Sequence, residues 1–292
     1  MVGVMPERRR ESKQRSAGDG AAAPRWRIGI SGWLYARWRG VFYPNDLPQR
    51  RELEYASRTF DSIEINGSFY SLQRAESWQR WHDQVPDGFV FAVKCPRFIS
   101  HIKRLRDIEA PLANFFASGV LLLGPKLGPL LWQFPPNLAF DAATWRAFLR
   151  QLPKTMAQAA KLAQRHDHRI AGVALPPRIG RQRLRYAVEV RHDSFRDNEF
   201  LELLRKHDVA LVVADTAGKH PAFDDITADF IYVRLHGGEV LYTSGYSDPS
   251  LRAWKRRIEG WSQGRRDVYV YFDNDAKVHA PFDAQRLRAR VG

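Results

Sequence analysis

Short apolar segments and segments with helical periodicity alternate along the chain from residue 25 onward. The short segments are rich in β-branched and aromatic residues and have the length of typical strands, roughly four to eight residues. We predict strands at residues 26–31, 62–66, 89–94, 129–134, 184–191, 209–215, 230–236 and 268–273. Between them apolar residues recur at steps of three and four, which predicts helices at residues 49–58, 75–84, 110–122, 144–151, 199–207 and 250–262.

Strands that alternate with helices are typical of parallel βαβ units. Eight such units in roughly 250 residues fit a closed (β/α)8 barrel of the TIM type, and the chain is too short for two comfortable domains. The alternative is an open doubly wound sheet, in which a glycine-rich dinucleotide turn follows a strand. The first strand ends in Gly29-Ile-Ser-Gly-Trp33, which lacks the third glycine at the required spacing. We therefore predict a single-domain barrel at residues 25–292.

Two segments do not follow this alternation of strands and helices. Residues 154–183 contain a helix-like stretch at 156–164 and then a break at Pro177 and Gly180 among several arginines. We interpret them as an elaborated connection before the fifth strand, with a solvent-exposed face rather than a binding lid. Residues 1–24 hold too little apolar surface to bury, so we expect a disordered basic tail there.

Polar residues gather where the predicted strands end. Because strand side chains alternate between two faces, their parity shows which of them point into the barrel. The inward-facing sets end in Glu64 and Asn66, Lys94, Gln133, Glu189 and Arg191, Asp215, and Arg234 and His236. A core does not show this pattern, because burying an unpaired charge is costly. Barrel enzymes build their active sites at the carboxyl ends of the strands, so this ring predicts a site there.

Charge narrows the choice of partners. The 292 residues carry a net charge of +14, and residues 1–24 hold five basic and three acidic residues, so the remainder keeps +12. A strongly basic body favours phosphorylated metabolites or nucleic acid, although an arginine-rich composition alone also produces it. The chain has neither an apolar run near the roughly 18 residues of a membrane span nor an apolar secretion segment. We therefore expect a soluble cytoplasmic protein without membrane contact, with the single Cys95 as a buried small hydrophobic residue.

The strand-end motifs resemble those of a known family. From Ile28 to Leu287 the chain resembles the YecE-like family, also called domain of unknown function 72. The matching segments include Gly29-Ile-Ser-Gly-Trp33, Glu64-Ile-Asn-Gly-Ser-Phe-Tyr70, Phe91-Ala-Val-Lys-Cys-Pro96, Gln133-Phe-Pro-Pro136, Glu189-Val-Arg-His192, Tyr232-Val-Arg-Leu-His-Gly237 and Tyr269-Val-Tyr-Phe-Asp-Asn-Asp275. The resemblance implies a TIM barrel but no reaction, since the family has none assigned. The chain departs from the family pattern at Asp273, where Asn is usual.

The cations of the ring are the best indication of a substrate, because guanidinium groups suit phosphate or carboxylate bidentately. Lys94, Arg191 and Arg234 come from the third, fifth and seventh strands. Together with His101 and Lys103, from the loop after the third strand, they are candidates for binding one anion. The other substrate-binding candidates are Asn66, Gln133, Asp273 and Asn274, with Trp33, Tyr70 and Tyr246 as rings able to stack on a base or sugar.

These candidates lead to an enzyme hypothesis. We predict a hydrolase acting on an anionic substrate that bears phosphate or derives from nucleic acid. Glu189 is the candidate general base, Glu64 orients substrate or water, and His236 is an acid or hydrogen-bond donor. Asp215 completes the catalytic set. We expect no cofactor, and the sequence predicts no particular protein partner.

Several alternatives stay open. One is a non-catalytic nucleic-acid-binding protein. Another is a glycoside hydrolase using Glu64 and Glu189, although neighbouring cations oppose the protonated acid that it needs. A third is an ion-pair network that only caps the barrel, with Glu64, Glu189 and Asp215 against Lys94, Arg191 and Arg234. A metal site is disfavoured, because the sequence lacks His-x-x-x-His and Cys-x-x-Cys spacings and the interleaved cations repel a metal ion.

Overall fold

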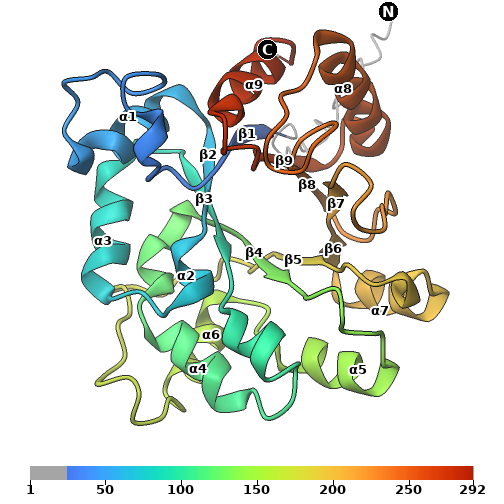
Figure 1. Cartoon of the computed structure of the whole chain (residues 1–292). Coiled ribbons are helices and arrows are strands. Elements are labelled where there is room, and N and C mark those ends of the chain that lie inside the picture. Colours follow the sequence, from blue (N-terminus) through green and yellow to red (C-terminus); the bar gives the residue numbers. More distant parts are fainter. Residues whose placement is uncertain (1–24, 292) are drawn as a thin grey trace, which may run out of the picture.

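A computed structural model describes residues 25–291, so the disordered tail predicted at residues 1–24 lies outside the described residues. The described strands form one sheet in which every pairing is parallel, and Figure 1 shows that they follow one another around a ring. They are β1 (Trp26–Ser31), β2 (Ser62–Ile65), β3 (Val90–Lys94), β4 (Leu127–Gln133), β5 (Tyr186–Glu189), β6 (Val209–Leu211), β7 (Val213–Asp215), β8 (Phe230–Leu235) and β9 (Asp267–Phe272).

The ring closes through the segment that contains β6 and β7. The strand order is β6-β5-β4-β3-β2-β1-β9-β8-β7, so these two consecutive strands stand at opposite ends of the sheet. β6 pairs with β5, the N–H of Val212 still donates to Val188 O at 2.9 Å, and β7 then pairs with β8. The predicted TIM barrel is therefore confirmed. The single strand predicted at residues 209–215 is corrected to two short strands, because each half pairs with a different neighbour.

Helices surround the ring (Figure 1). They are α1 (Glu52–Thr59), α2 (Gly67–Tyr70), α3 (Ala75–Gln84), α4 (Glu109–Ala117), α5 (Ala142–Gln151), α6 (Met156–Ala163), α7 (Asn198–His207), α8 (Asp248–Ser262) and α9 (His279–Arg288). The helix predicted at 110–122 ends early, because Gly119 takes a left-handed conformation with φ of 109°. The sequence pattern does not predict α9, whose buried face consists largely of small residues such as Ala280 and Ala284.

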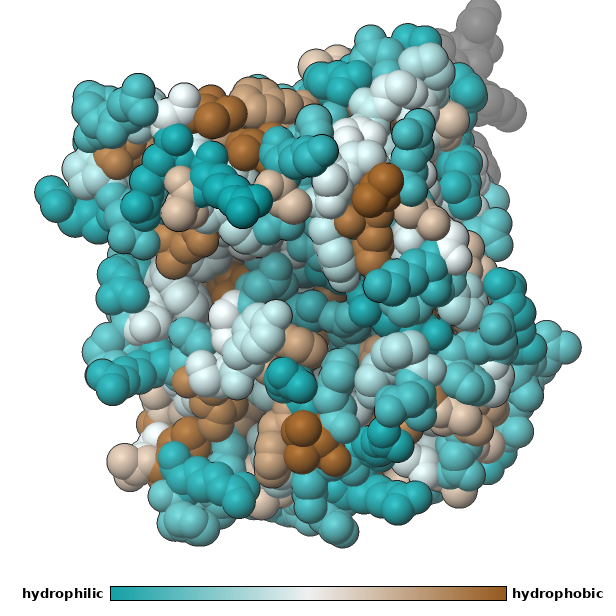
Figure 2. Space-filling view, in the orientation of Figure 1, coloured by the Kyte–Doolittle hydropathy of each residue, from teal (hydrophilic) through white to brown (hydrophobic). Residues whose placement is uncertain are grey.

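Figure 2, drawn in the same orientation, shows this face of the molecule hollowed over the middle of the ring. α2 lies on this face in Figure 1 and directly follows β2 in the chain. The hollow is therefore at the end of the barrel where β2 finishes. None of the helices formed by residues 25–291 combines the length and the apolar character needed to cross a membrane.

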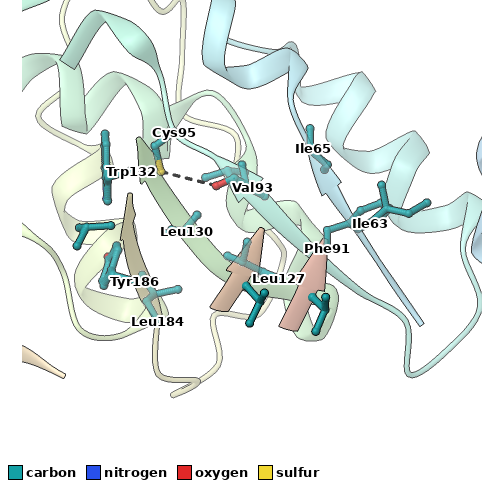
Figure 3. Close-up of a cluster of buried hydrophobic side chains, with 14 of the residues drawn as sticks. Ile63, Ile65, Phe91, Val93, Cys95, Leu127, Leu130, Trp132, Leu184 and Tyr186 are labelled. Atoms are coloured by element: carbon teal, nitrogen blue, oxygen red, sulfur yellow. Dashed lines mark hydrogen bonds between the residues drawn. The ribbon is translucent and has the colours of Figure 1, made fainter. Parts of the chain in front are cut away.

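Apolar side chains fill both faces of the sheet. The outward faces of β2 to β5 carry a cluster that includes Ile63, Phe91, Leu130, Trp132 and Tyr186 (Figure 3). Cys95 belongs to this cluster and is fully buried, with its Sγ 3.8 Å from Val93 O, which confirms the packing role predicted for it. The barrel interior holds a second cluster that includes Val90, Ala92, Leu131, Ala187, Ala210, Val212, Tyr232, Tyr269 and Tyr271.

The inner cluster explains where the polar ring lies. Lys94, Gln133 and Glu189 each come two residues after an inner-cluster residue on the same strand, so they continue the inward face toward the carboxyl end. The interior below is packed with aromatic and aliphatic side chains, as in other barrels of this type. The polar side chains consequently form a layer on top of a closed apolar core.

Candidate active site at the barrel mouth

Arg234 is the centre of the polar layer. Its side chain is fully buried at the end of β8, and its guanidinium group donates to three carboxylates. Nε and Nη2 bind the two oxygens of Glu64 at 3.1 and 2.8 Å, and Nη1 binds Glu189 Oε2 at 2.7 Å. Nη2 also donates to Asp273 Oδ2 at 2.9 Å and Ser31 Oγ at 3.2 Å. We call Ser31, Glu64, Glu189, Arg234, His236 and Asp273 the Arg234 cluster.

Mutual pairing fixes the charges of this cluster. Burial opposes ionisation of Glu189, but Arg191 and Arg234 outweigh burial and hold the pKa of this carboxyl well below its usual range. Burial likewise opposes the charge of Asp273, and Arg234 together with His236 keeps its pKa low. The carboxylates in turn raise the pKa of Arg234 against the effect of its burial. Glu189, Asp273 and Arg234 therefore stay ionised at neutral pH.

This geometry corrects one binding prediction and weakens two catalytic ones. Arg234 is unavailable to a substrate, because protein acceptors occupy its nitrogens and its side chain is buried. Glu189 is a poor general base, because a carboxylate with such a low pKa accepts protons weakly. A single guanidinium group bridges Glu64 and Glu189, and the low pKa of Glu189 denies it the protonated state that a glycosidase acid requires.

Ser31 and Asn66 complete the cluster on the β1–β2 side. Ser31 Oγ donates to Glu64 Oε1 at 2.5 Å and accepts from Asn66 Nδ2 at 2.9 Å. Asn66 Oδ1 is buried without a hydrogen-bond partner among the described residues. Such an acceptor costs free energy unless a ligand donor reaches it. The sequence analysis missed Ser31, because a serine at a strand end carries no distinctive signal.

Lys94 differs from the other cations at the mouth. It ends β3, its side chain is mostly buried, and it forms no ion pair within the described part of the chain. Its Nζ lies 4.4 Å from the centre of the Phe69 ring, which gives it a cation–π contact in place of a carboxylate. Burial, together with the charge of Arg234, lowers the pKa of Lys94 to about 8. Among residues 25–291, Lys94 thus has no carboxylate within ion-pair distance, and Glu64, Asp273 and Glu189 act on it only from farther away.

Arg191 and His101 stand close enough to share this electrostatic environment. Arg191 donates to Glu189 Oε1 through Nε at 2.8 Å and Nη2 at 2.6 Å, while its Nη1 forms no hydrogen bond in the described structure. Burial and the charges of Arg97 and Lys94 lower the pKa of His101 to about 4, so its ring is neutral at pH 7. The neighbouring strand β4 ends in Gln133, a buried amide that pairs in register with Glu189.

The sequence analysis did not single out the carboxyl of Asp275, which lies just beyond β9. His236 Nδ1 lies 2.9 Å from Asp273 Oδ2, which confirms that the ends of β8 and β9 meet. Two residues further on, burial and the charge of Asp273 raise the pKa of Asp275 to about 6. Tyr35, whose Oη donates to Ser31 O at 2.6 Å, lies beside Asp275. A carboxyl that titrates near neutral pH is suited to proton transfer.

Asp215 and Tyr246 belong to a different group from the one predicted. On the strand segment that carries Asp215, Ala210 and Val212 face the interior, so the inward parity assigned to Asp215 is wrong. Its carboxylate instead accepts from Tyr246 Oη at 3.0 Å, and the same hydroxyl accepts from Gly237 N at 3.0 Å. Tyr246 is buried by these contacts, so it does not offer a ring to a ligand.

Three more candidates have contacts that explain them without a ligand. Asn274 is fully buried and donates to Ser244 O at 3.0 Å and Asp283 Oδ2 at 2.9 Å, which ties its loop to α9. Trp33 packs edge-to-face on Trp81 with ring centres 5.4 Å apart, inside the outer core. Lys103 lies 3.7 Å from Asp107 and lines a separate cavity toward α5.

Tyr70, by contrast, is 71% exposed at the end of α2. Phe69, its neighbour, contacts Lys94, so Tyr70 stands beside the mouth with its ring largely free. Among residues 25–291, no group of three or more His, Cys, Asp or Glu side chains is arranged to hold a metal ion. The candidate site therefore consists of the Arg234 cluster and, around it, Asn66, Lys94, His101, Gln133, Arg191 and Asp275.

The chain is similar to curated proteins from two bacteria. The YecE protein of Escherichia coli is 31% identical over 128 residues, which cover 43% of this chain and 44% of YecE, less than half of its length. The YunF protein of Bacillus subtilis is 24% identical over 89% of this chain and 92% of its own length.

Solved structures and a family model identify the family of this chain. A DUF72 family protein from Thermotoga maritima superposes with a TM-score of 0.71 at 25% identity, covering 91% of this chain and 99% of that protein. One from Enterococcus faecalis gives a TM-score of 0.68 at 16% identity, covering 92% and 98%, and shows a shared fold. The model described as "Protein of unknown function DUF72" matches residues 27–292. The chain therefore belongs to the DUF72 family.

Proposed function

We propose that this protein is an enzyme that hydrolyses a phosphate-bearing anionic substrate bound at the mouth of the barrel. The observation that carries this proposal is Lys94, an ammonium group held at the mouth with a cation–π contact but without an ion pair among the described residues. A buried charge without a partner is costly. A bound anion compensates that cost, so the position of Lys94 favours an anionic ligand.

Arg191 supplies a second contact for the same anion. Two of its nitrogens hold Glu189, which fixes the plane of the guanidinium group, and Nη1 remains for a ligand oxygen. Its side chain is 13% exposed, so a ligand can reach it from the mouth. An ammonium and a preoriented guanidinium group together suit phosphate, because charge-assisted hydrogen bonds are roughly twice as strong as neutral ones.

Proton transfer falls to Asp275 in this proposal, in place of Glu189. With a pKa of about 6, the Asp275 carboxyl is mostly ionised at pH 7 and still basic enough to accept a proton from water. Lys94, with a pKa of about 8, keeps its proton at pH 7 and stabilises charge that develops on the phosphate. Glu64 and Glu189 hold the guanidinium groups of Arg234 and Arg191 in place.

A binding and activity experiment tests the proposal. Calorimetric titration with inorganic phosphate at low salt should give binding that Lys94→Ala weakens at least about tenfold, the effect of losing one charge-assisted contact. Lys103→Ala is the matched control, because Lys103 already pairs with Asp107 and should leave phosphate affinity unchanged. Asp275→Asn should keep phosphate binding but lower turnover of p-nitrophenyl phosphate by roughly 10²- to 10⁴-fold. Equal phosphate affinity in the two lysine variants would refute the proposed anion site.

A second candidate function rests on the net charge of +14. A non-catalytic nucleic-acid-binding protein would hold phosphates with cations on its outer surface, whereas the proposed enzyme uses cations inside the mouth. The two candidates differ in the effect of Lys94→Ala, which should weaken inorganic phosphate binding in the enzyme and leave duplex binding unchanged in the alternative.

A further inference from the structure

We infer that the cavity beside α2 is a subsite for a planar aromatic group of the substrate, so that the substrate is an aromatic phosphate rather than a simple one. This inference rests on the proposed function, because it extends the anion site at Lys94. The cavity has a volume of about 270 Å³ and is lined mainly by apolar side chains, among them Phe69, Tyr70, Leu72, Phe98 and Ile99. Ligand pockets for drug-sized molecules begin at roughly 300 Å³, so this one suits a single ring system.

Phe69 connects the cavity to the anion site. Its ring lines the cavity and also carries Lys94 Nζ at 4.4 Å from its centre, with His101 packed edge-to-face at 5.2 Å. One side chain thus separates the unpaired ammonium group from the apolar space. A ligand that places an anion at Lys94 and a ring in the cavity therefore has to pass around the Phe69 ring.

The backbone around the cavity is held in place. Ser68 Oγ donates to Lys94 O at 2.7 Å, which joins α2 to the end of β3. Phe98 begins a short π-helical turn, Phe98–Ile102, that follows the same strand. Both walls are therefore attached to the strand that carries Lys94, and the distance between the anion site and the cavity is fixed by the fold.

Two of the aromatic residues that line the cavity are exposed. Tyr70 is 71% exposed and Phe98 is 40% exposed, although each contributes a ring to the cavity. The guanidinium group of Arg169 lies 5.6 Å from the centre of the Phe98 ring and lines the same cavity. Exposed rings beside a planar cation are the arrangement that stacks on an aromatic ligand. Arg169 also lies 3.6 Å from Asp167, so the charge that favours an anionic ligand is that of Lys94 behind Phe69.

Titration of the full chain with phenyl phosphate and inorganic phosphate tests the subsite. Stacking on one ring should make phenyl phosphate bind roughly 5- to 150-fold more tightly than inorganic phosphate. Tyr70→Ala should remove most of this preference without changing the affinity for inorganic phosphate, and Tyr70→Phe should restore it because the ring returns. Phe98→Ala should reduce the preference, while Phe282→Ala, a similarly exposed ring on α9, should not.

The two ligands separate failure of the subsite from failure of the proposed function. If inorganic phosphate binds in a Lys94-dependent manner but phenyl phosphate binds no better, the subsite is wrong and the anion site stands. The same result would favour contact with a protein partner as the role of the exposed Tyr70 and Phe98 rings. If phenyl phosphate binds through Tyr70 while neither ligand responds to Lys94→Ala, the cavity is a ring site and the proposed phosphate site is wrong. If neither ligand binds, both proposals are overturned.

Discussion

Arg234 and Lys94 are both cations at the barrel mouth, yet their surroundings differ: carboxylates surround Arg234, and an aromatic ring contacts Lys94. The guanidinium group of Arg234 has several donors in one plane, and Glu64, Glu189 and Asp273 occupy them. The ammonium group of Lys94 is a single point charge on a flexible stem and rests on the Phe69 ring. The residue type thus separates a cation that holds the barrel mouth together from one that is available to a ligand.

The pH dependence of anion binding follows from this difference. Sulfate keeps the same charge from pH 6 to about pH 10, so only the protein titrates in this range. The pKa of Lys94 is lowered to about 8, which means that the ammonium form is present below that pH and is lost as the pH rises through it. Asp275, with a pKa of about 6, is mostly ionised by pH 7, so the fall that follows reports Lys94: sulfate affinity should decrease by about tenfold per pH unit above 8.

Lys94→Arg is the control for this titration, because a guanidinium group stays protonated throughout this range. Its sulfate affinity, measured by calorimetry, should show no fall near pH 8. A fall of the same size in the wild type and in Lys94→Arg would mean that another group titrates, and the assignment of the anion site to Lys94 would then be wrong.

For individual residues, the sequence predicts part of the candidate site. Alternation along the strands correctly places Glu64, Glu189, Arg234 and His236 at the mouth, because each has inward parity and lies at the carboxyl end of its strand. Alternation fails at Asp215, since both faces of residues 209–214 are apolar and hydrophobicity alone cannot show which one is inward. Asp275 was not predictable, because the loop after β9 has no periodicity and its pKa depends on Asp273 and on burial.

At the scale of elements, strand packing is most demanding where β1 meets β2. A Cβ atom on Gly29 would lie 1.7 Å from Ser62 O, whereas one on Gly260, inside α8, would have open space around it. Gly29→Ala should therefore destabilise the fold by about 3 kcal/mol or more, because the backbone of β2 must move. Gly260→Ala should stabilise it by roughly 0.5–1 kcal/mol, the usual gain of alanine over glycine in a helix.

Urea unfolding of the two glycine variants measures both effects against the wild type. A Gly29→Ala variant as stable as the wild type would show that β1 and β2 are farther apart than described, and the closed ring would then be in question. Elements with wide apolar faces, such as α8, are predictable from sequence for the same reason that they are stable: one face meets the core. α9 escapes prediction because Ala280 and Ala284 bury little apolar surface.

For the whole molecule, closure of the ring and net charge have separate consequences. The order of the strands follows from their order in the chain, since parallel βαβ units place successive strands side by side, which is why the barrel was predictable from the sequence. The way it closes was not, because Val209–Leu211 and Val213–Asp215 pair with different neighbours within one segment. Net charge, by contrast, depends only on composition and acts on partners through the field of the whole surface.

The net charge of +14 should give weak duplex DNA binding that depends on salt rather than on base sequence. Each phosphate neutralised by a lysine or arginine releases counterions, so the logarithm of the affinity should fall linearly with the logarithm of the salt concentration. Deleting residues 1–24 removes only five basic and three acidic residues, so binding should weaken slightly and persist on the remaining +12.

Fluorescence anisotropy with labelled duplexes of two unrelated sequences measures the slope of log affinity against log salt concentration. Lys94→Ala should leave it unchanged, because a duplex is too wide to reach a side chain that is mostly buried in the barrel mouth. Undetectable binding at low salt would remove the support for a nucleic-acid-binding function.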